Sequence, residues 1–142
     1  MKNIEERYDV AVIGGGVAGV IASIAAARHG CKTCLIHDRP VLGGNASSEI
    51  RVGIEGADYK FRHARETGIL EEIRTEDRKR NYHRSINGAT NYIFDTILLE
   101  WIKREENIVL HLNTCVFKAY RKGSSIEAVE GAQSGSENIY KE

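Results

Sequence analysis

The sequence has little proline, few aromatic residues and no net charge. One proline and one tryptophan stand against 14 glycines in 142 residues. This composition suits an α/β fold with tight turns better than a disordered chain. Lysine plus arginine and aspartate plus glutamate both number 20. The overall charge therefore gives no reason to expect nucleic acid or a membrane surface as a partner.

Long apolar runs are also missing from the chain. No run is long enough to cross a bilayer, and the charged N-terminus, MKNIEERYD, lacks the apolar core of a signal peptide. These absences predict a cytoplasmic protein. The length suits a single domain, residues 1–142, and a hydrophobic content of 42% is enough for a core.

Cysteine is scarce, with Cys31, Cys34 and Cys115 as the three examples. The first two form a C-x-x-C pair, a spacing found in redox and metal sites. A second pair that would complete a zinc site is missing. Cys34 also falls in a predicted strand, where residues three apart point to opposite faces. We expect buried, inert thiols and no metal site.

The strongest pattern in the chain lies in residues 8–38. An apolar run ends in Gly14, Gly16 and Gly19 at G-x-G-x-x-G spacing, and an alanine-rich segment follows. Gly14 permits a sharp turn, Gly16 lets a pyrophosphate approach the backbone, and Gly19 lets a helix lie close to the strand. The helix N-terminus would then face the phosphates. The alternative is an ordinary glycine turn.

These signals predict a nucleotide-binding βαβ unit with strands over 8–14 and 33–36 and a helix over 17–29. The first strand lacks polar alternation, which predicts burial on both of its faces. An acid usually binds the ribose at the end of the second strand. His37 or Asp38 holds that position here, and an imidazole bonds a hydroxyl less strongly than a carboxylate does. Arg39 is a candidate ligand for the 2′-phosphate of NADP.

A second glycine pair follows in the loop 40–57, which a simple NAD fold does not require. At this point the sequence resembles the FAD-dependent oxidoreductases with a glutathione-reductase-type nucleotide fold. It is most similar to the bacterial members that carry a GGNxS stretch after the second strand. The matching residues are VIGGGVAG at 12–19, LIHDRPVLGGNAS at 35–47 and SEIRVGIEGA at 48–57.

The resemblance implies FAD as cofactor, with NAD(P)H as a candidate electron donor. That family usually has a glutamate where His37 stands. The implied cofactor-binding residues are Gly14, Gly16, Val17, Ala18, Gly19, His37, Asp38, Arg39, Gly43, Gly44, Asn45, Ser47, Arg51 and Val116, the last through backbone near the adenine. The resemblance names no catalytic residue, because in this family the flavin itself reacts and the substrate pocket belongs mainly to a part that this sequence lacks. The substrate is unknown for the same reason.

Residues 62–104 form a helical excursion. Helices are predicted over 62–79 and 91–104, and the second has apolar residues at helical spacing, with Asn91 as its cap and Trp101 in the core. This helix should pack on the sheet beside the first one. A basic cluster suggests either an anionic ligand or, more simply, a solvated helix face. It comprises Arg74, Arg78, Lys79, Arg80 and Arg84. His63 and His83 are acid–base candidates without supporting partners.

The last third of the chain is predicted to be mainly β structure. Residues 108–112 predict a third parallel strand, 116–120 and 126–130 a small hairpin, and 131–142 a fraying tail. The fold class is thus α/β, a Rossmann-like FAD/NAD(P)-binding fold with a parallel sheet flanked by helices, plus the hairpin.

The resemblance covers only the N-terminal part of that family, whose members add a further strand and a substrate domain. We therefore expect a fragment that holds the ADP part of FAD, incomplete as an enzyme and prone to self-association through an exposed sheet edge. Two alternatives stay open. One is an NAD(P)-binding oxidoreductase domain, and the other is a non-catalytic nucleotide-binding fragment of a truncated gene.

Overall fold

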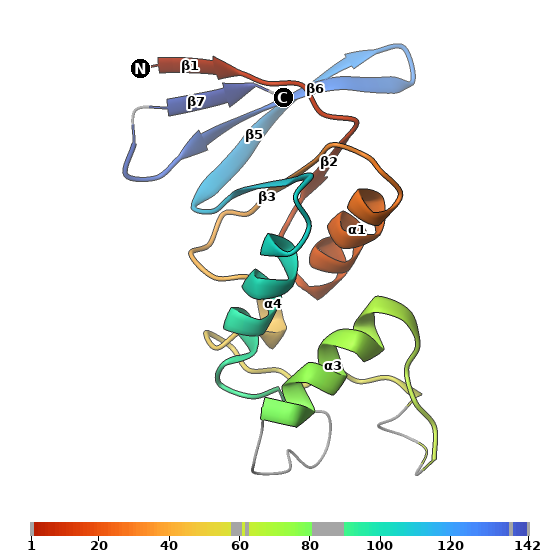
Figure 1. Cartoon of the computed structure of the whole chain (residues 1–142). Helices are drawn as coiled ribbons and strands as arrows, with labels where there is room; N and C mark the ends of the chain where they lie inside the picture. Colours follow the sequence, from red (N-terminus) through yellow and green to blue (C-terminus); the bar gives the residue numbers. More distant parts are fainter. Residues whose placement is uncertain (1, 58–60, 62, 81–89, 137, 142) are drawn as a thin grey trace.

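A computed structural model describes residues 2–57, 61, 63–80, 90–136 and 138–141. It contains two sheets. The parallel sheet has the order β2 (Val10–Ile13), β3 (Thr33–Ile36), β4 (Ile108–His111). The four-stranded sheet has the order β1 (Lys2–Glu5), β7 (Asn138–Lys141), β6 (Ser125–Gln133), β5 (Thr114–Lys122). The helices are α1 (Val17–Arg28), α3 (Gly68–Arg80), α4 (Phe94–Lys103) and the short 3-10 helix η1 (Gly44–Ala46). Figure 1 shows the four-stranded sheet at one end, α3 at the other, and the parallel sheet with α1 and α4 between them.

The central strand β3 is buried on both faces, as expected for a parallel strand between two layers. On one face Leu35 joins the apolar side chains of α1 and α4, including Ile24 and Leu98. On the other face Cys34 and Ile36 pack against Val129 of β6, in the four-stranded sheet. The predicted α/β fold is confirmed, and α4 packs beside α1 as expected.

Strand β2 differs from the prediction. Its residues alternate between half-buried and exposed, and Ile13 is 50% exposed. The physical reason is position: within the part of the chain that the structure describes, β2 pairs only with β3 and forms one edge of the parallel sheet. An apolar run therefore did not distinguish an edge strand from a central one.

Both helices of the excursion begin later than predicted. α3 starts at Gly68, not at residue 62, because Gly68 has φ +62°, a left-handed conformation that interrupts a right-handed helix. α4 starts at Phe94, and Asn91 takes part through its backbone carbonyl, which accepts the Phe94 N–H at 3.0 Å. The predicted side-chain cap by Asn91 is wrong. Trp101 is buried in the core, as predicted.

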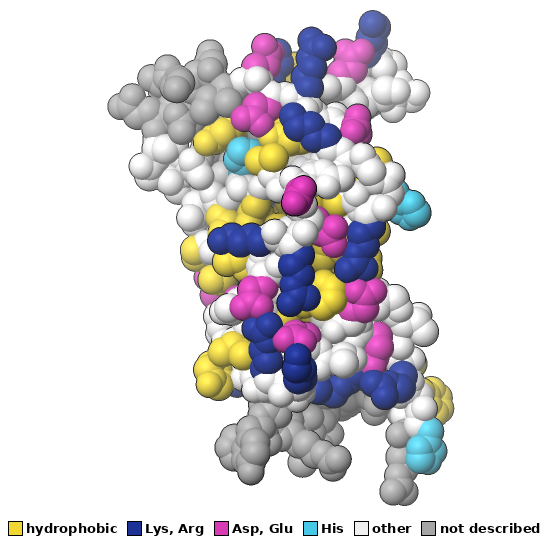
Figure 2. Space-filling view, viewed as in Figure 1, with side chains coloured by type: hydrophobic (Ala, Val, Ile, Leu, Met, Phe, Trp, Pro, Cys, Tyr) yellow, Lys and Arg dark blue, Asp and Glu magenta, His cyan; other side chains and the backbone are white. Residues whose placement is uncertain are grey.

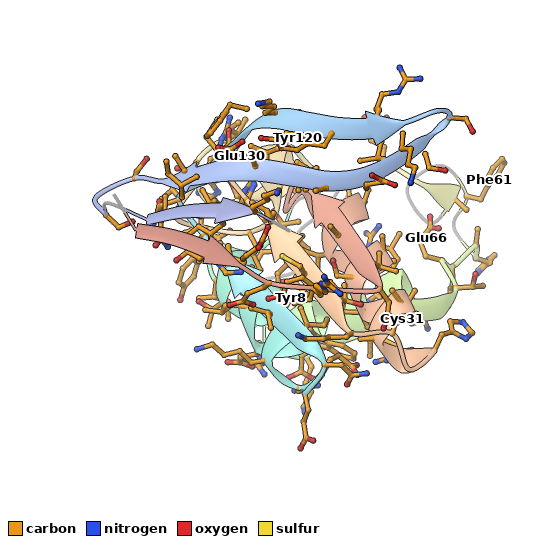
Figure 3. The ribbon with its side chains drawn as sticks, turned by 90° about the horizontal axis from the view of Figure 1, so that it is seen from above. Tyr8, Cys31, Phe61, Glu66, Tyr120 and Glu130 are labelled. Atoms are coloured by element: carbon orange, nitrogen blue, oxygen red, sulfur yellow. The ribbon has the colours of Figure 1, made fainter. Side chains whose placement is uncertain are left out.

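The C-terminal tail does not fray where the sequence suggested it would. Strand β6 continues to Gln133, and β7 adds antiparallel to it. The N-terminal strand β1, which the sequence reasoning missed, pairs parallel to β7. The first and last strands therefore lie side by side in one sheet (Figure 1). The predicted hairpin is confirmed as β5–β6, and Figure 3 shows the hydrogen-bonded pair Tyr120 and Glu130 facing each other across it.

The cysteines are free thiols that differ in exposure. Cys34 is buried in β3, Cys31 is half-buried and Cys115 is exposed, so the expectation of buried thiols holds for Cys34 alone. Within the described part of the chain no group of three metal-ligating side chains occurs. No described helix is long and apolar enough to span a membrane.

Asp77 on α3 gives a stability prediction. Burial raises its pKa above the ordinary 3.8, although the Asn91 N–H, Arg74 and Arg78 oppose the shift. Because the folded pKa of Asp77 is raised, the contribution of this group to stability is greatest below its ordinary pKa and is lost as the pH rises through the folded value. Asp77→Asn is therefore expected to raise the melting temperature at pH 7 by a few degrees, with the gain vanishing below pH 4. Thermal unfolding from pH 3 to 8 measures this; an unchanged pH profile in the variant would contradict it.

Candidate functional site

The carboxyl ends of the three parallel strands gather three loops at one edge of the sheet. Neighbouring strand ends are joined by backbone hydrogen bonds: the Gly14 N–H donates to the Ile36 carbonyl at 2.8 Å, and the His37 N–H to the His111 carbonyl at 2.8 Å. The Thr114 N–H donates to the His37 carbonyl, also at 2.8 Å. Ligands of open α/β sheets collect at this edge.

The first loop after β2 leaves the N-terminus of α1 open. Gly16 occupies the position before the helix, no side chain caps the helix, and its first turn carries no acidic residue. A Cβ built on Gly16 would meet no described atom within 4 Å. Open space beside uncapped N–H groups, at the positive end of a helix dipole, suits an anion such as a pyrophosphate.

Gly19 confirms the close approach of helix and strand. A Cβ on Gly19 would lie 1.8 Å from the carbonyl oxygen of Gly14. Only glycine permits this distance, since the obstacle is backbone rather than a movable side chain. The spacing rule therefore predicted both the turn at Gly14, where φ is +111°, and the packing at Gly19.

A second loop, residues 43–47, lies directly against the first. The Gly43 N–H donates to the Gly15 carbonyl at 2.8 Å, and Gly16 and Gly43 form an isolated parallel bridge. Gly44 has φ +56°, and a Cβ on it would come within 3.2 Å of the Gly16 Cα. We name residues 14–19 and 43–47 the paired glycine loops. The two glycine motifs, far apart in sequence, make one site.

Gly15 is a site residue that the sequence reasoning missed. A Cβ there would approach Leu42 to 2.6 Å and the His37 ring to 2.8 Å. Its N–H donates to His37 Nδ1 at 3.0 Å, so the first glycine loop is joined to the end of β3. The signal was that Gly15 is the middle one of three consecutive glycines, a position that the G-x-G-x-x-G pattern leaves free.

His37 and Asp38 both lie where a nucleotide-binding fold usually has its ribose-binding acid, but they differ in exposure. His37 is buried with Nδ1 engaged by Gly15, and its Nε2 is buried without a hydrogen-bond partner among the described residues. The Asp38 carboxylate is 65% exposed and lies 3.3 Å from His37 Nδ1. Of the two, Asp38 therefore presents the open hydrogen-bond acceptor at the end of β3.

The remaining predicted residues lie around the same edge. Arg39 forms a 3.5 Å ion pair with Glu49. Arg51 is exposed and adopts a left-handed backbone with φ +62°, unusual for a residue other than glycine. Asn45 is exposed, whereas Ser47 is fully buried and its hydroxyl accepts the Glu49 N–H at 3.3 Å. Val116 is half-buried on β5 and packs toward β3.

Three members of the basic cluster pair with carboxylates, whereas Arg74 donates to the Ile54 carbonyl at 3.4 Å. Arg78 pairs with Glu71, Lys79 with Glu76, and Arg80 with both Glu76 and Glu100. Figure 2 shows positive and negative side chains interspersed over this part of the surface. The reading as a solvated helix face therefore fits better than an anion site. His63 is exposed, and His83 and Arg84 lie outside the described residues.

Comparisons with known proteins agree with this geometry. The family model described as "FAD dependent oxidoreductase" matches residues 9–141. The tRNA uridine 5-carboxymethylaminomethyl modification enzyme MnmG of Lactococcus lactis is 68% identical over 34 residues, which are 24% of this chain and 5% of that protein. The soluble pyridine nucleotide transhydrogenase of Hahella chejuensis is 49% identical over 43 residues, 30% of this chain and 9% of that protein.

Solved structures share the fold. The myxobacterial chondrochloren halogenase CndH, described as a variant of FAD-dependent halogenases, superposes with a TM-score of 0.63 at 17% identity. That alignment covers 94% of this chain and 35% of the halogenase. The chain therefore spans well under two thirds of the length of the proteins it matches.

Proposed function

Because the chain belongs to the FAD-dependent oxidoreductase family, we propose that its paired glycine loops hold the ADP half of FAD. The observation that carries the proposal is the contact between the loops: the Gly43 N–H bonds the Gly15 carbonyl beside the uncapped N-terminus of α1. A simple turn would need only one of the two glycine motifs.

The roles of individual residues follow from their positions. Backbone N–H groups of Gly16, Val17 and Ala18 would bind the pyrophosphate, and Gly14 and Gly19 would shape the turn. The Asp38 carboxylate would accept hydrogen bonds from the ribose hydroxyls. His37 would support the first glycine loop through its hydrogen bond with the Gly15 N–H. Gly43, Gly44, Asn45, Ser47 and Arg51 would line the way to the flavin, and backbone near Val116 would meet the adenine.

The residues fit the group on chemical grounds. The space beside Gly16 is open, and no acidic side chain stands in the first turn of α1 to repel a phosphate. When bound, FAD would supply the electron or hydride chemistry, and the protein would supply binding, orientation and exclusion of water. For the whole enzyme we propose oxidoreductase activity on a small molecule in the cytoplasm. The GGNxS subgroup stays a prediction.

The NAD(P) alternative has one supporting observation. Arg39 lies near the ribose position and could receive the 2′-phosphate of NADP. Its guanidinium, however, pairs with Glu49 at 3.5 Å, so a phosphate would compete with that carboxylate. NAD(P)H as an electron donor to the flavin is a separate proposal and does not require this site.

The test is the visible absorbance spectrum of the purified chain after incubation with FAD and desalting, with NADP⁺ and NAD⁺ binding measured in parallel. A retained flavin spectrum, with weaker binding of NADP⁺ and NAD⁺, is expected. Preferential binding of NADP⁺ would favour the NAD(P) alternative. Absence of binding by all three nucleotides would contradict the proposal and both of its nucleotide-binding alternatives.

We also propose self-association through the free edge of β2. Among the described residues that strand pairs on one side only, and Ile13 on it is 50% exposed. Exposed strand edges pair readily with other chains. Native mass in solution is expected to exceed that of the 15.8 kDa monomer. A monomer at all concentrations, with Ile13→Lys behaving identically, would contradict the proposal.

A further inference from the structure

The second glycine loop is held from outside by the helix α4 and the residues before it. The Ser48 N–H donates to Asp95 Oδ1 at 2.8 Å, and the Ser48 hydroxyl donates to the other carboxylate oxygen. The Thr90 hydroxyl donates to the Ala46 carbonyl at 2.9 Å, in a buried contact. Both contacts join residues more than 40 positions apart in sequence.

The same helix also packs against the loop. Leu98 of α4 lies where a Cβ on Gly43 would approach to 3.1 Å. A mobile loop would lose binding free energy on becoming ordered around a ligand, whereas a loop held beforehand does not. The loop itself spans only a short 3-10 helix, which offers few internal hydrogen bonds of its own.

We propose that Asp95 is a positioning residue of the cofactor site. Its carboxylate fixes Ser48, and through residues 44–48 it sets the position of Gly43 and Gly44 against the first glycine loop. Asp95 itself need not contact the cofactor. This inference rests on the proposed function, since it assigns to α4 the task of ordering the second loop before FAD binds.

Two substitutions of Asp95 separate this positioning role from simple stabilisation of the helix. Asp95 stands in the first turn of α4, where a negative charge also favours the helix dipole. Asp95→Asn removes the charge but keeps an oxygen that can accept the Ser48 N–H. Asp95→Ala removes both. The two variants therefore differ in the contact to the loop and agree in the loss of helix-end charge.

The experiment compares the full chain with Asp95→Ala, Asp95→Asn and the control Glu100→Ala, which removes another carboxylate of α4 that pairs with Arg80 instead. Three quantities are measured: amide hydrogen exchange of Ser48 without nucleotide, the FAD dissociation constant by flavin fluorescence, and the melting temperature of each variant. Asp95→Ala is expected to speed the exchange and weaken FAD binding by about tenfold each, the size of a lost bond to a charged group. Asp95→Asn and the control should stay near wild type.

Equal exchange rates of the Ser48 amide in all variants would show that Asp95 does not hold the second glycine loop. Faster exchange with an unchanged FAD dissociation constant would overturn the positioning role. An equal fall in melting temperature and FAD affinity in Asp95→Ala and Asp95→Asn would show a helix-end effect instead. A wild-type chain that binds no FAD would refute the proposed function and the positioning role together, while the exchange rates would still decide whether Asp95 holds the loop.

Discussion

Gly16→Ala is expected to weaken FAD binding strongly while leaving the fold intact. Gly16 has φ −66° and ψ 174°, a conformation that alanine adopts without strain, and its added methyl would meet no described atom within 4 Å. The same methyl would enter the space beside the uncapped N–H groups of α1. Each lost hydrogen bond to a charged group costs about 1.5–3 kcal/mol, so affinity should fall about tenfold to a hundredfold per bond.

Fluorescence titration with FAD measures this loss, and thermal unfolding checks the fold. Ala22→Ser is the matched control, because Ala22 is exposed on the same helix but lies beyond its first turn. Wild-type affinity in Gly16→Ala would mean that the pyrophosphate does not lie against this loop.

Gly19→Ala is expected to have the opposite character and to destabilise the whole domain. The new Cβ would lie 1.8 Å from the Gly14 carbonyl oxygen. The backbones at Gly14 and residue 19 could move apart only if α1 separated from β2. That separation would disturb the buried contacts of Val20 and Ile24. Forcing extra atoms into a packed interface typically costs 1–3 kcal/mol, and we expect about 3 kcal/mol or more here because the obstacle is backbone.

Urea unfolding measures the effect as a fall in the midpoint. Gly16→Ala serves as the internal control, since it adds the same methyl three positions earlier in the same motif. A Gly19→Ala chain with wild-type stability would contradict the packing described here. Together the two variants assign separate tasks, one to binding and one to folding, within a single six-residue motif.

Local signals predicted the part of the fold that local geometry determines. The strand, turn and helix of residues 10–28 and strand β3 appeared close to their predicted bounds, because glycine spacing and apolar runs act over a few residues. The two glycine motifs meet because the parallel strands before them end at the same edge of the sheet, a contact that the sequence analysis did not predict.

Other features depend on partners distant in sequence, and the pattern could not reveal them. Strand β1 and the tail β7 become strands by pairing residues 2–5 with 138–141. Gly15 is constrained by His37, 22 positions away, and the loop at Ser48 is held by Asp95, 47 positions away. The exposure of β2 reflects its place at the sheet edge.

The most direct test of the proposed cofactor site is an amide NMR titration of the full chain with FAD. The proposal predicts shifts concentrated in the paired glycine loops, with Gly15, Gly16 and Gly43 among the most affected. Gly123 and Gly135, in the turns of the four-stranded sheet, should stay unchanged. Shifts confined to the charged face of α3, or no shifts in either glycine loop at saturating FAD, would contradict it.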